Sequence, residues 1–112
     1  MHKKRTYKKI PQTIKKEINQ YIAELRKDLI DIEDIYLFGS YAKGTQNRSS
    51  DIDICIVSPS FSHPMKAMQY LWGKTPHHSK VAIEPVGFHP KDFKDSYSSL
   101  IQEIKKNGIR IE

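Results

Sequence analysis

Two short segments decide the fold of this 112-residue chain: FGSYAKG at residues 38–44 and SDIDI at residues 50–54. The apolar, bounded run at 35–38 predicts a buried strand. Gly39 can adopt backbone angles that other residues resist, and Ser40 belongs to a residue type that often caps helices. We therefore expect the chain to leave a strand, turn sharply and enter a short helix, whose first N–H groups favour an anion.

The two aspartates that follow are expected to act together. Side chains alternate between the faces of a strand, so Asp51 and Asp53 share one face, while Ile52, Ile54 and Ile56 can be buried on the other. Mg²⁺ prefers one or two carboxylates together with phosphate oxygens and water. Two carboxylates beside a phosphate-accepting turn therefore predict a Mg²⁺ site.

The spacing of these groups carries a resemblance to a known family. Gly39-Ser40, ten intervening residues and Asp51-Ile52-Asp53 form the pattern G-S-x10-D-x-D, which resembles the signature of the polymerase-β-like nucleotidyltransferase superfamily. The short chain is most similar to the minimal nucleotidyltransferases, or MNT proteins, many of which are antitoxins encoded beside a helical HEPN toxin. The resemblance implies a small mixed sheet with helices packed against it.

The resemblance also implies roles in nucleotide binding. Gly39 and Ser40 would clamp the triphosphate, since glycine lets the backbone approach a phosphate and the serine hydroxyl can donate to a phosphate oxygen. Lys43 would reach the β- or γ-phosphate as a point charge, where family members often carry Arg. The alternative for Lys43 is a solvated surface lysine.

Three acids would form the catalytic and metal-binding set. By the resemblance, Asp51 and Asp53 hold the metal ions, and Glu84 is the third carboxylate, a metal ligand and the base for the acceptor hydroxyl. Glu84 is the only acid in the strand expected over 80–86, and Pro85 after it indicates an open edge. The alternative for Glu84 is a solvent-facing side chain.

The spacing of apolar residues and the positions of proline and glycine predict the remaining helices and strands. Together they indicate one α/β (α+β) domain over 1–112. Residues 1–9 are expected to form a solvated basic arm. The expected helices are 11–29, a short one ending near Lys43, 64–72 with Met65, Met68, Leu71 and Trp72 buried, and 90–106, opened by Pro90, with Phe93, Tyr97, Leu100, Ile101 and Ile104 buried. The expected strands are 35–38, 51–57, 80–86 and an edge strand at 109–111.

Composition narrows the class of protein. The chain is 38% hydrophobic and 29% charged, which is typical of a folded globular domain. No apolar run approaches the roughly 20 residues that span a bilayer. The single Cys55 cannot form an internal disulfide and predicts a reducing, cytoplasmic location with a buried structural role. Much of the net charge of +6 lies at the chain ends, so a nucleic-acid partner is not expected.

Two other groups of residues were weighed and set aside. His77 and His78 lack the cysteine or acid partners that a zinc site needs. Tyr70 and Trp72 could stack on a nucleotide base, but buried positions on a helix explain them at lower cost.

The sequence therefore predicts a Mg²⁺-dependent nucleotidyltransferase that moves AMP from ATP to a hydroxyl. The resemblance to MNT antitoxins implies a tyrosine of a HEPN-type partner as acceptor. The alternative is an antitoxin that neutralises its partner by occlusion without catalysis. A transferase acting on RNA or small molecules ranks lower, because the added acceptor-binding domain of such relatives is absent. The oligomeric state, including a homo-oligomer, stays open.

Overall fold

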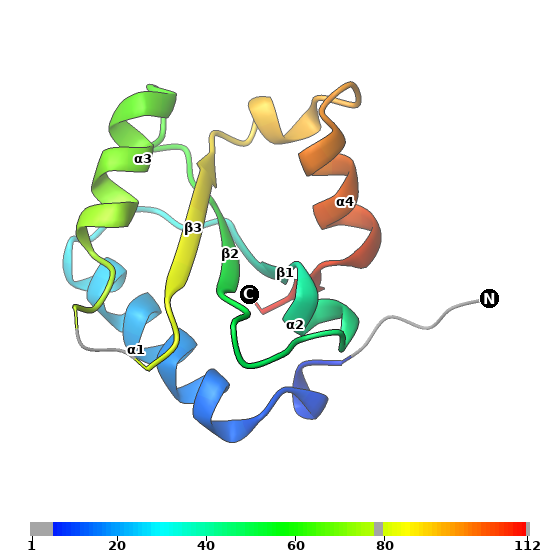
Figure 1. Ribbon diagram of the computed structural model, residues 1–112. Coiled ribbons are helices and arrows are strands. Elements are labelled where there is room, and N and C mark those ends of the chain that lie inside the picture. Colours follow the sequence, from blue (N-terminus) through cyan, green and yellow to red (C-terminus); the bar gives the residue numbers. More distant parts are fainter. Residues whose placement is uncertain (1–5, 78–79, 112) are drawn as a thin grey trace.

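A four-stranded mixed sheet forms the centre of the computed structural model, which describes residues 6–77 and 80–111 (Figure 1). The strand order is β3-β2-β1-β4. β1 pairs antiparallel with both β2 and β4, whereas β2 pairs parallel with β3. The strands are β1 (Asp34–Phe38), β2 (Ile52–Val57), β3 (Ile83–Phe88) and β4 (Ile109–Arg110). The predicted α/β class with a small mixed sheet is confirmed.

Helices cover both faces of this sheet (Figure 1). One apolar cluster joins α1 and α3 to the sheet, and a second joins the sheet to α4 and to the short 3₁₀ turn before it. The helical elements are η1 (Tyr7–Lys9), α1 (Gln12–Lys27), α2 (Ser40–Lys43), α3 (Pro64–Gly73), η2 (Asp92–Lys94) and α4 (Ser99–Asn107).

Alternation along β2 places its side chains in these two clusters. Ile52, Ile54 and Ile56 are fully buried in the cluster with α1 and α3. Cys55 and Val57 are buried on the opposite face with α4. The prediction of a buried, structural Cys55 is confirmed, and Asp53 lies on that same face, next to the end of its apolar cluster.

Pro85 fits β3 because β3 is an edge strand. Ile52 N–H donates to Ala82 O at 2.8 Å, and Ser58 N–H donates to Phe88 O at 3.0 Å. In this parallel ladder the even-numbered residues of β3 therefore direct their backbone groups toward β2. The missing N–H of Pro85 faces away from the sheet, where no strand pairs with it.

The predicted strands and the first helices agree with the structure to within a few residues. The helix expected at 11–29 spans 12–27, and the one expected at 64–72 spans 64–73. The strand expected at 80–86 begins later, at Ile83, and the edge strand at the C-terminus is present. Residues 1–5 of the predicted basic arm lie outside the described residues.

The single helix predicted over 90–106 is wrong. The chain forms η2, turns, and starts α4 only at Ser99. Two local hydrogen bonds explain the interruption: Tyr97 N–H donates to Asp95 Oδ1 at 2.9 Å, and Ile101 N–H donates to Ser98 Oγ at 3.2 Å. Such side chains offer the backbone an alternative to a continuing helix.

The buried residues of this segment were predicted only in part. Tyr97 is 95% exposed and Leu100 is 39% exposed, because the turn before Ser99 changes the direction that both were expected to face. The other three predicted residues, Phe93, Ile101 and Ile104, are buried as expected.

The buried face predicted for α3 is also largely wrong. Met65, Met68 and Trp72 are 67%, 50% and 46% exposed, so Trp72 is not a core residue. The buried positions are Ala67 and Leu71, which lie four residues apart on one helix face. The helix packs on its narrower apolar face and leaves the larger side chains toward solvent.

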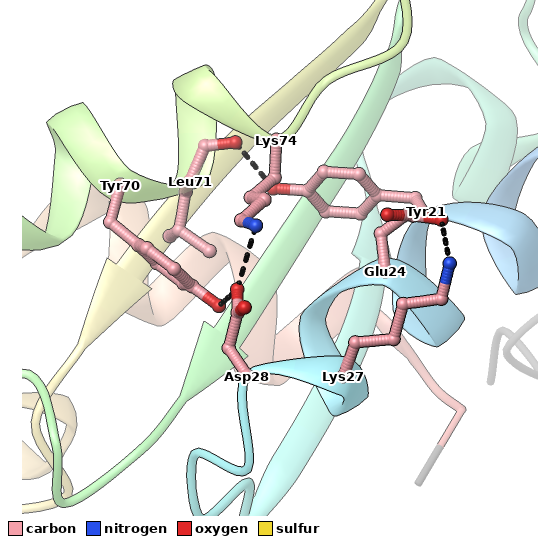
Figure 2. A network of polar contacts seen from close by, with 7 residues as sticks. All are labelled: Tyr21, Glu24, Lys27, Asp28, Tyr70, Leu71 and Lys74. Carbon is pink, nitrogen blue, oxygen red and sulfur yellow. Dashed lines mark hydrogen bonds and ion pairs between the residues drawn. The ribbon is translucent and has the colours of Figure 1, made fainter.

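Polar contacts between α1 and α3 fix the position of these helices (Figure 2). The buried Tyr21 hydroxyl donates to Leu71 O at 2.8 Å. Nearer the surface, the Tyr70 hydroxyl donates to Asp28 Oδ2 at 2.6 Å, and Lys74 forms an ion pair with the same carboxylate at 2.9 Å. In the described part of the chain, no helix has the length and apolar character needed to cross a membrane.

We expect Tyr21→Phe to lower the free energy of unfolding by about 1 kcal/mol, because a buried carbonyl loses one of its donors. Tyr70→Phe, which removes an exposed hydroxyl from the same helix pair, should cost less, within about 0.5 kcal/mol. Urea titrations of both variants measure this difference. A larger loss for Tyr70→Phe would contradict this account of the α1–α3 contact.

Candidate active site

The strand register brings two of the predicted acids side by side. Asp53 of β2 is the register partner of Glu84 in β3 and of Phe38 in β1. Neighbouring strands lie about 4.8 Å apart, and register partners present their side chains to the same face. Asp51 lies directly before β2, two residues from Asp53. The structure therefore gathers all three acids, from two neighbouring strands, at one end of the sheet.

Gly39 makes the room that Asp53 occupies. Its backbone angles, φ 73° and ψ −153°, lie in a region that other residues rarely adopt. A Cβ added at Gly39 would lie 2.1 Å from Asp53 Oδ2 and 3.0 Å from Asp53 Cγ. The Asp53 carboxylate thus packs directly against the turn between β1 and α2. The predicted strand–turn–helix is confirmed at these residues.

The prediction that Ser40 caps the short helix is wrong by one position. Gly39 is the N-cap residue, and no side chain caps α2. Ser40 is the first residue of α2, is partly exposed, and its carbonyl accepts a hydrogen bond from Thr45 N–H at 3.0 Å. The Ser40 hydroxyl is therefore not used as a cap, and the positive φ of the turn is at Gly39.

The carboxyl groups repel one another as anions. A hydrogen bond with Asp51 raises the pKa of Glu84, and burial and the charges of Asp51 and Asp53 raise it further. Burial raises the pKa of Asp53, with a further rise from the Asp51 charge and an opposing effect of a hydrogen bond with Glu84. Asp53 and Glu84 therefore hold their protons more tightly than isolated carboxylic acids do.

The chemistry of this donor set fits a hard divalent cation. Carboxylate oxygens are the ligands that Mg²⁺ prefers, and a cation would relieve the repulsion that now favours protonation. Across residues 6–77 and 80–111, however, no three His, Cys, Asp or Glu side chains are arranged so that they could hold a metal ion. A metal ion bound here would therefore require these carboxyl groups to move toward it.

The alternative of a simply solvated Lys43 does not hold, because the lysine has an ion-pair partner. Its Nζ forms an ion pair with Glu103 Oε1 at 2.7 Å, which links α2 to α4. The second oxygen, Glu103 Oε2, accepts a hydrogen bond from Asn107 Nδ2 at 3.0 Å. Sequence reasoning missed Glu103 because nothing in its own helix indicates a contact with a residue 60 positions earlier.

A family model matches most of the chain. Residues 15–111 match the family described as "Nucleotidyltransferase domain". The chain is 50% identical over 40 residues to protein adenylyltransferase MntA of Shewanella oneidensis, a segment covering 36% of this chain and 29% of that protein. It is 41% identical over 61 residues to a Methanocaldococcus jannaschii protein provisionally named a protein adenylyltransferase, covering 50% of this chain and 61% of the relative. The matches span less than two thirds of either relative.

Solved structures share the fold. A toxin–antitoxin structure with AMP-PNP has a TM-score of 0.62 and 29% identity, over 82% of this chain and 69% of that chain. A mutant of the MntA–HpeT toxin–antitoxin pair gives a TM-score of 0.58 and 28% identity over the same shares. A provisionally named nucleotidyltransferase from Sulfolobus solfataricus has a TM-score of 0.60 at 17% identity, over 89% of this chain and 86% of that one, which shows the fold alone.

We expect Gly39→Ala to displace the Asp53 carboxylate and to strain the turn, at a cost on the order of 1–3 kcal/mol from the backbone alone. The matched control is Gly73→Ala, because a Cβ at Gly73 meets nothing within 4 Å and the residue ends a helix. The control should be neutral or slightly stabilising. Thermal unfolding of both variants measures the contrast. Equal melting temperatures for the two variants would contradict a tight fit of Asp53 against the turn.

We also expect Asp53→Asn to stabilise the metal-free protein at neutral pH. A raised pKa in the folded state means that the fold binds more protons than the unfolded chain, so its stability falls as pH rises above the ordinary value of 3.8. The variant cannot ionise and escapes this loss, which we put on the order of 1 kcal/mol at most because Asp53 is partly exposed.

Urea titrations of the wild type and Asp53→Asn between pH 3.5 and about 8, with a metal chelator present, test this expectation. The advantage of the variant should be absent at the acidic end and should grow toward neutral pH. A variant that is less stable than the wild type at neutral pH would show that the carboxylate stabilises the fold instead.

Proposed function

We propose that this chain, which belongs to the nucleotidyltransferase domain family, is a metal-dependent adenylyltransferase that moves AMP from ATP to a protein hydroxyl. The observation that carries the proposal is the register that sets Asp53 beside Glu84, against a glycine turn with no side chain. The names of the relatives, protein adenylyltransferases, support AMP as the group transferred.

The reaction needs an acceptor oxygen in line with the bond that breaks. The hydroxyl oxygen would form a new bond to the α-phosphorus while the bond from that phosphorus to the bridging oxygen breaks, and pyrophosphate leaves with the bonding electrons. The hydroxyl proton would pass to the Glu84 carboxylate, which must be deprotonated beforehand.

The phosphates of the nucleotide would be held at the Gly39–Ser40 turn, beside the acids. Gly39 lets the backbone come close to the phosphates, and the partly exposed Ser40 hydroxyl can donate to a phosphate oxygen. Asp51, Asp53 and Glu84 would hold Mg²⁺, which when bound would neutralise triphosphate charge and orient the phosphates. Most of the catalytic effect would then come from positioning and charge compensation.

The proposed acceptor is a tyrosine of a HEPN-type partner protein, and the proposed role is that of an antitoxin. Support comes from two of the similar solved structures, which are toxin–antitoxin structures, one of them with AMP-PNP. The proposed location is the cytoplasm, and the single free cysteine, which is buried, supports it.

The test is transfer of label from ATP labelled at the α-phosphate to the protein encoded by the neighbouring gene, purified together with this chain. Asp53→Ala should lower the transfer rate by about a hundredfold or more, because the site loses a carboxylate at the reacting phosphate. Asp31→Ala, which removes an exposed carboxylate before β1, should leave the rate unchanged.

Equal transfer by the wild type and Asp53→Ala would contradict the proposed site. Neutralisation of a toxic partner without any label transfer would instead support the antitoxin that acts by occlusion.

A further inference from the structure

The reaction proposed above gives no role to the ion pair between Lys43 and Glu103. The lysine lies at the end of α2 and the glutamate in the middle of α4, with Nζ and Oε1 2.7 Å apart. Asn107 holds the other carboxylate oxygen at 3.0 Å. The hydrogen bond from Lys43 lowers the pKa of Glu103, so this carboxylate is an anion at neutral pH. A fixed negative charge therefore faces the lysine closest in sequence to the glycine turn.

Lys43 lies where it can pair with the Glu103 carboxylate or with a triphosphate bound at the glycine turn. Its N–H donates to Gly39 O at 3.2 Å, so Lys43 stands one helical turn above the glycine that shapes the site. Lysine has a flexible four-carbon stem, so rotation of the side chain would let the head group leave Glu103 and turn toward phosphates bound at the Gly39–Ser40 turn.

The ion pair contributes little as a structural contact. The side chains of Lys43 and Glu103 are 45% and 35% exposed, so water weakens the pair, although the Glu103 Oε1 atom itself is buried. The Glu103 carboxylate matters more because it competes with the triphosphate for Lys43, and because its negative charge repels an incoming triphosphate. Its effect on ligand binding is therefore expected to exceed its effect on folding.

We propose that Glu103 is the counter-ion that holds Lys43 in the nucleotide-free protein, releases it to the β- or γ-phosphate, and thereby sets the affinity for the triphosphate. The proposal rests on the nucleotide site of the proposed function. Once pyrophosphate leaves, Glu103 would recapture the lysine, which favours release of the product. Glu103 acts through Lys43 and is a positioning residue.

Isothermal titration with AMP-PNP and with AMP, both with Mg²⁺, tests the proposal. Glu103→Gln keeps an oxygen that can accept from Lys43 but removes the charge. It should tighten AMP-PNP binding by about threefold to tenfold, the range expected for removing one partly exposed charge near the ligand. AMP binding should not change, because AMP has no β- or γ-phosphate.

A double-mutant cycle shows whether Glu103 acts through Lys43. In the Lys43→Met background, Glu103→Gln should have less than half of its effect on AMP-PNP affinity. The control is Glu24→Gln, which breaks an exposed ion pair with Lys27 on α1 and should alter neither affinity. If Glu103→Gln does not fold, Glu103→Ala is judged by the same comparison of AMP-PNP with AMP.

Weaker or unchanged AMP-PNP binding in Glu103→Gln would overturn the proposal, as would an equal change for AMP or a full effect without Lys43. These outcomes leave the proposed function standing, since label transfer by the wild type tests it separately. A wild type that binds no AMP-PNP would overturn both.

Discussion

The pairing of Asp53 with Glu84 across β2 and β3, against a glycine that leaves room for the aspartate, is the constraint on which the site depends. The register is held in place because Ile52, Ile54 and Ile56 are buried on one face of β2 while Cys55 and Val57 are buried on the other. A shift of one residue would exchange these faces and would no longer pair Asp53 with Glu84. The packing of the sheet therefore decides where the acids lie.

This arrangement places carboxyl groups that repel one another, when ionised, at one end of the sheet. Burial and neighbouring charge raise the pKa of Asp53, and carboxyl contacts do the same for Glu84. A protein selected only for stability would place amides or apolar residues there. Perturbed acids held together by a rigid sheet are typical of sites that bind cations or move protons. The same sheet end carries the turn and α2, so an anionic ligand would meet the acids and Lys43 together.

The sequence predicted those features that depend on residues close together in the chain. The alternation at 51–57 predicted the shared face of the aspartates, and Gly39 predicted the turn. Glu84 was selected because it is the only acid in its strand and because of the family resemblance. The resemblance predicted that Glu84 would join the aspartates, but the exact Asp53–Glu84 register follows from strand pairing. The Lys43–Glu103 pair was missed, because it follows from how α4 packs. The helix predicted over 90–106 failed because Asp95 and Ser98 bind backbone N–H groups and interrupt it. Trp72 was misplaced because α3 packs through Ala67 and Leu71.

The most direct measurement is a crystal structure of the protein with Mn²⁺ and AMP-PNP, in which anomalous scattering locates the metal. The account predicts Mn²⁺ bound by at least two of the carboxylates of Asp51, Asp53 and Glu84 and by triphosphate oxygens next to Gly39. A nucleotide bound elsewhere, or a metal ion with no ligand among these three acids, would contradict it.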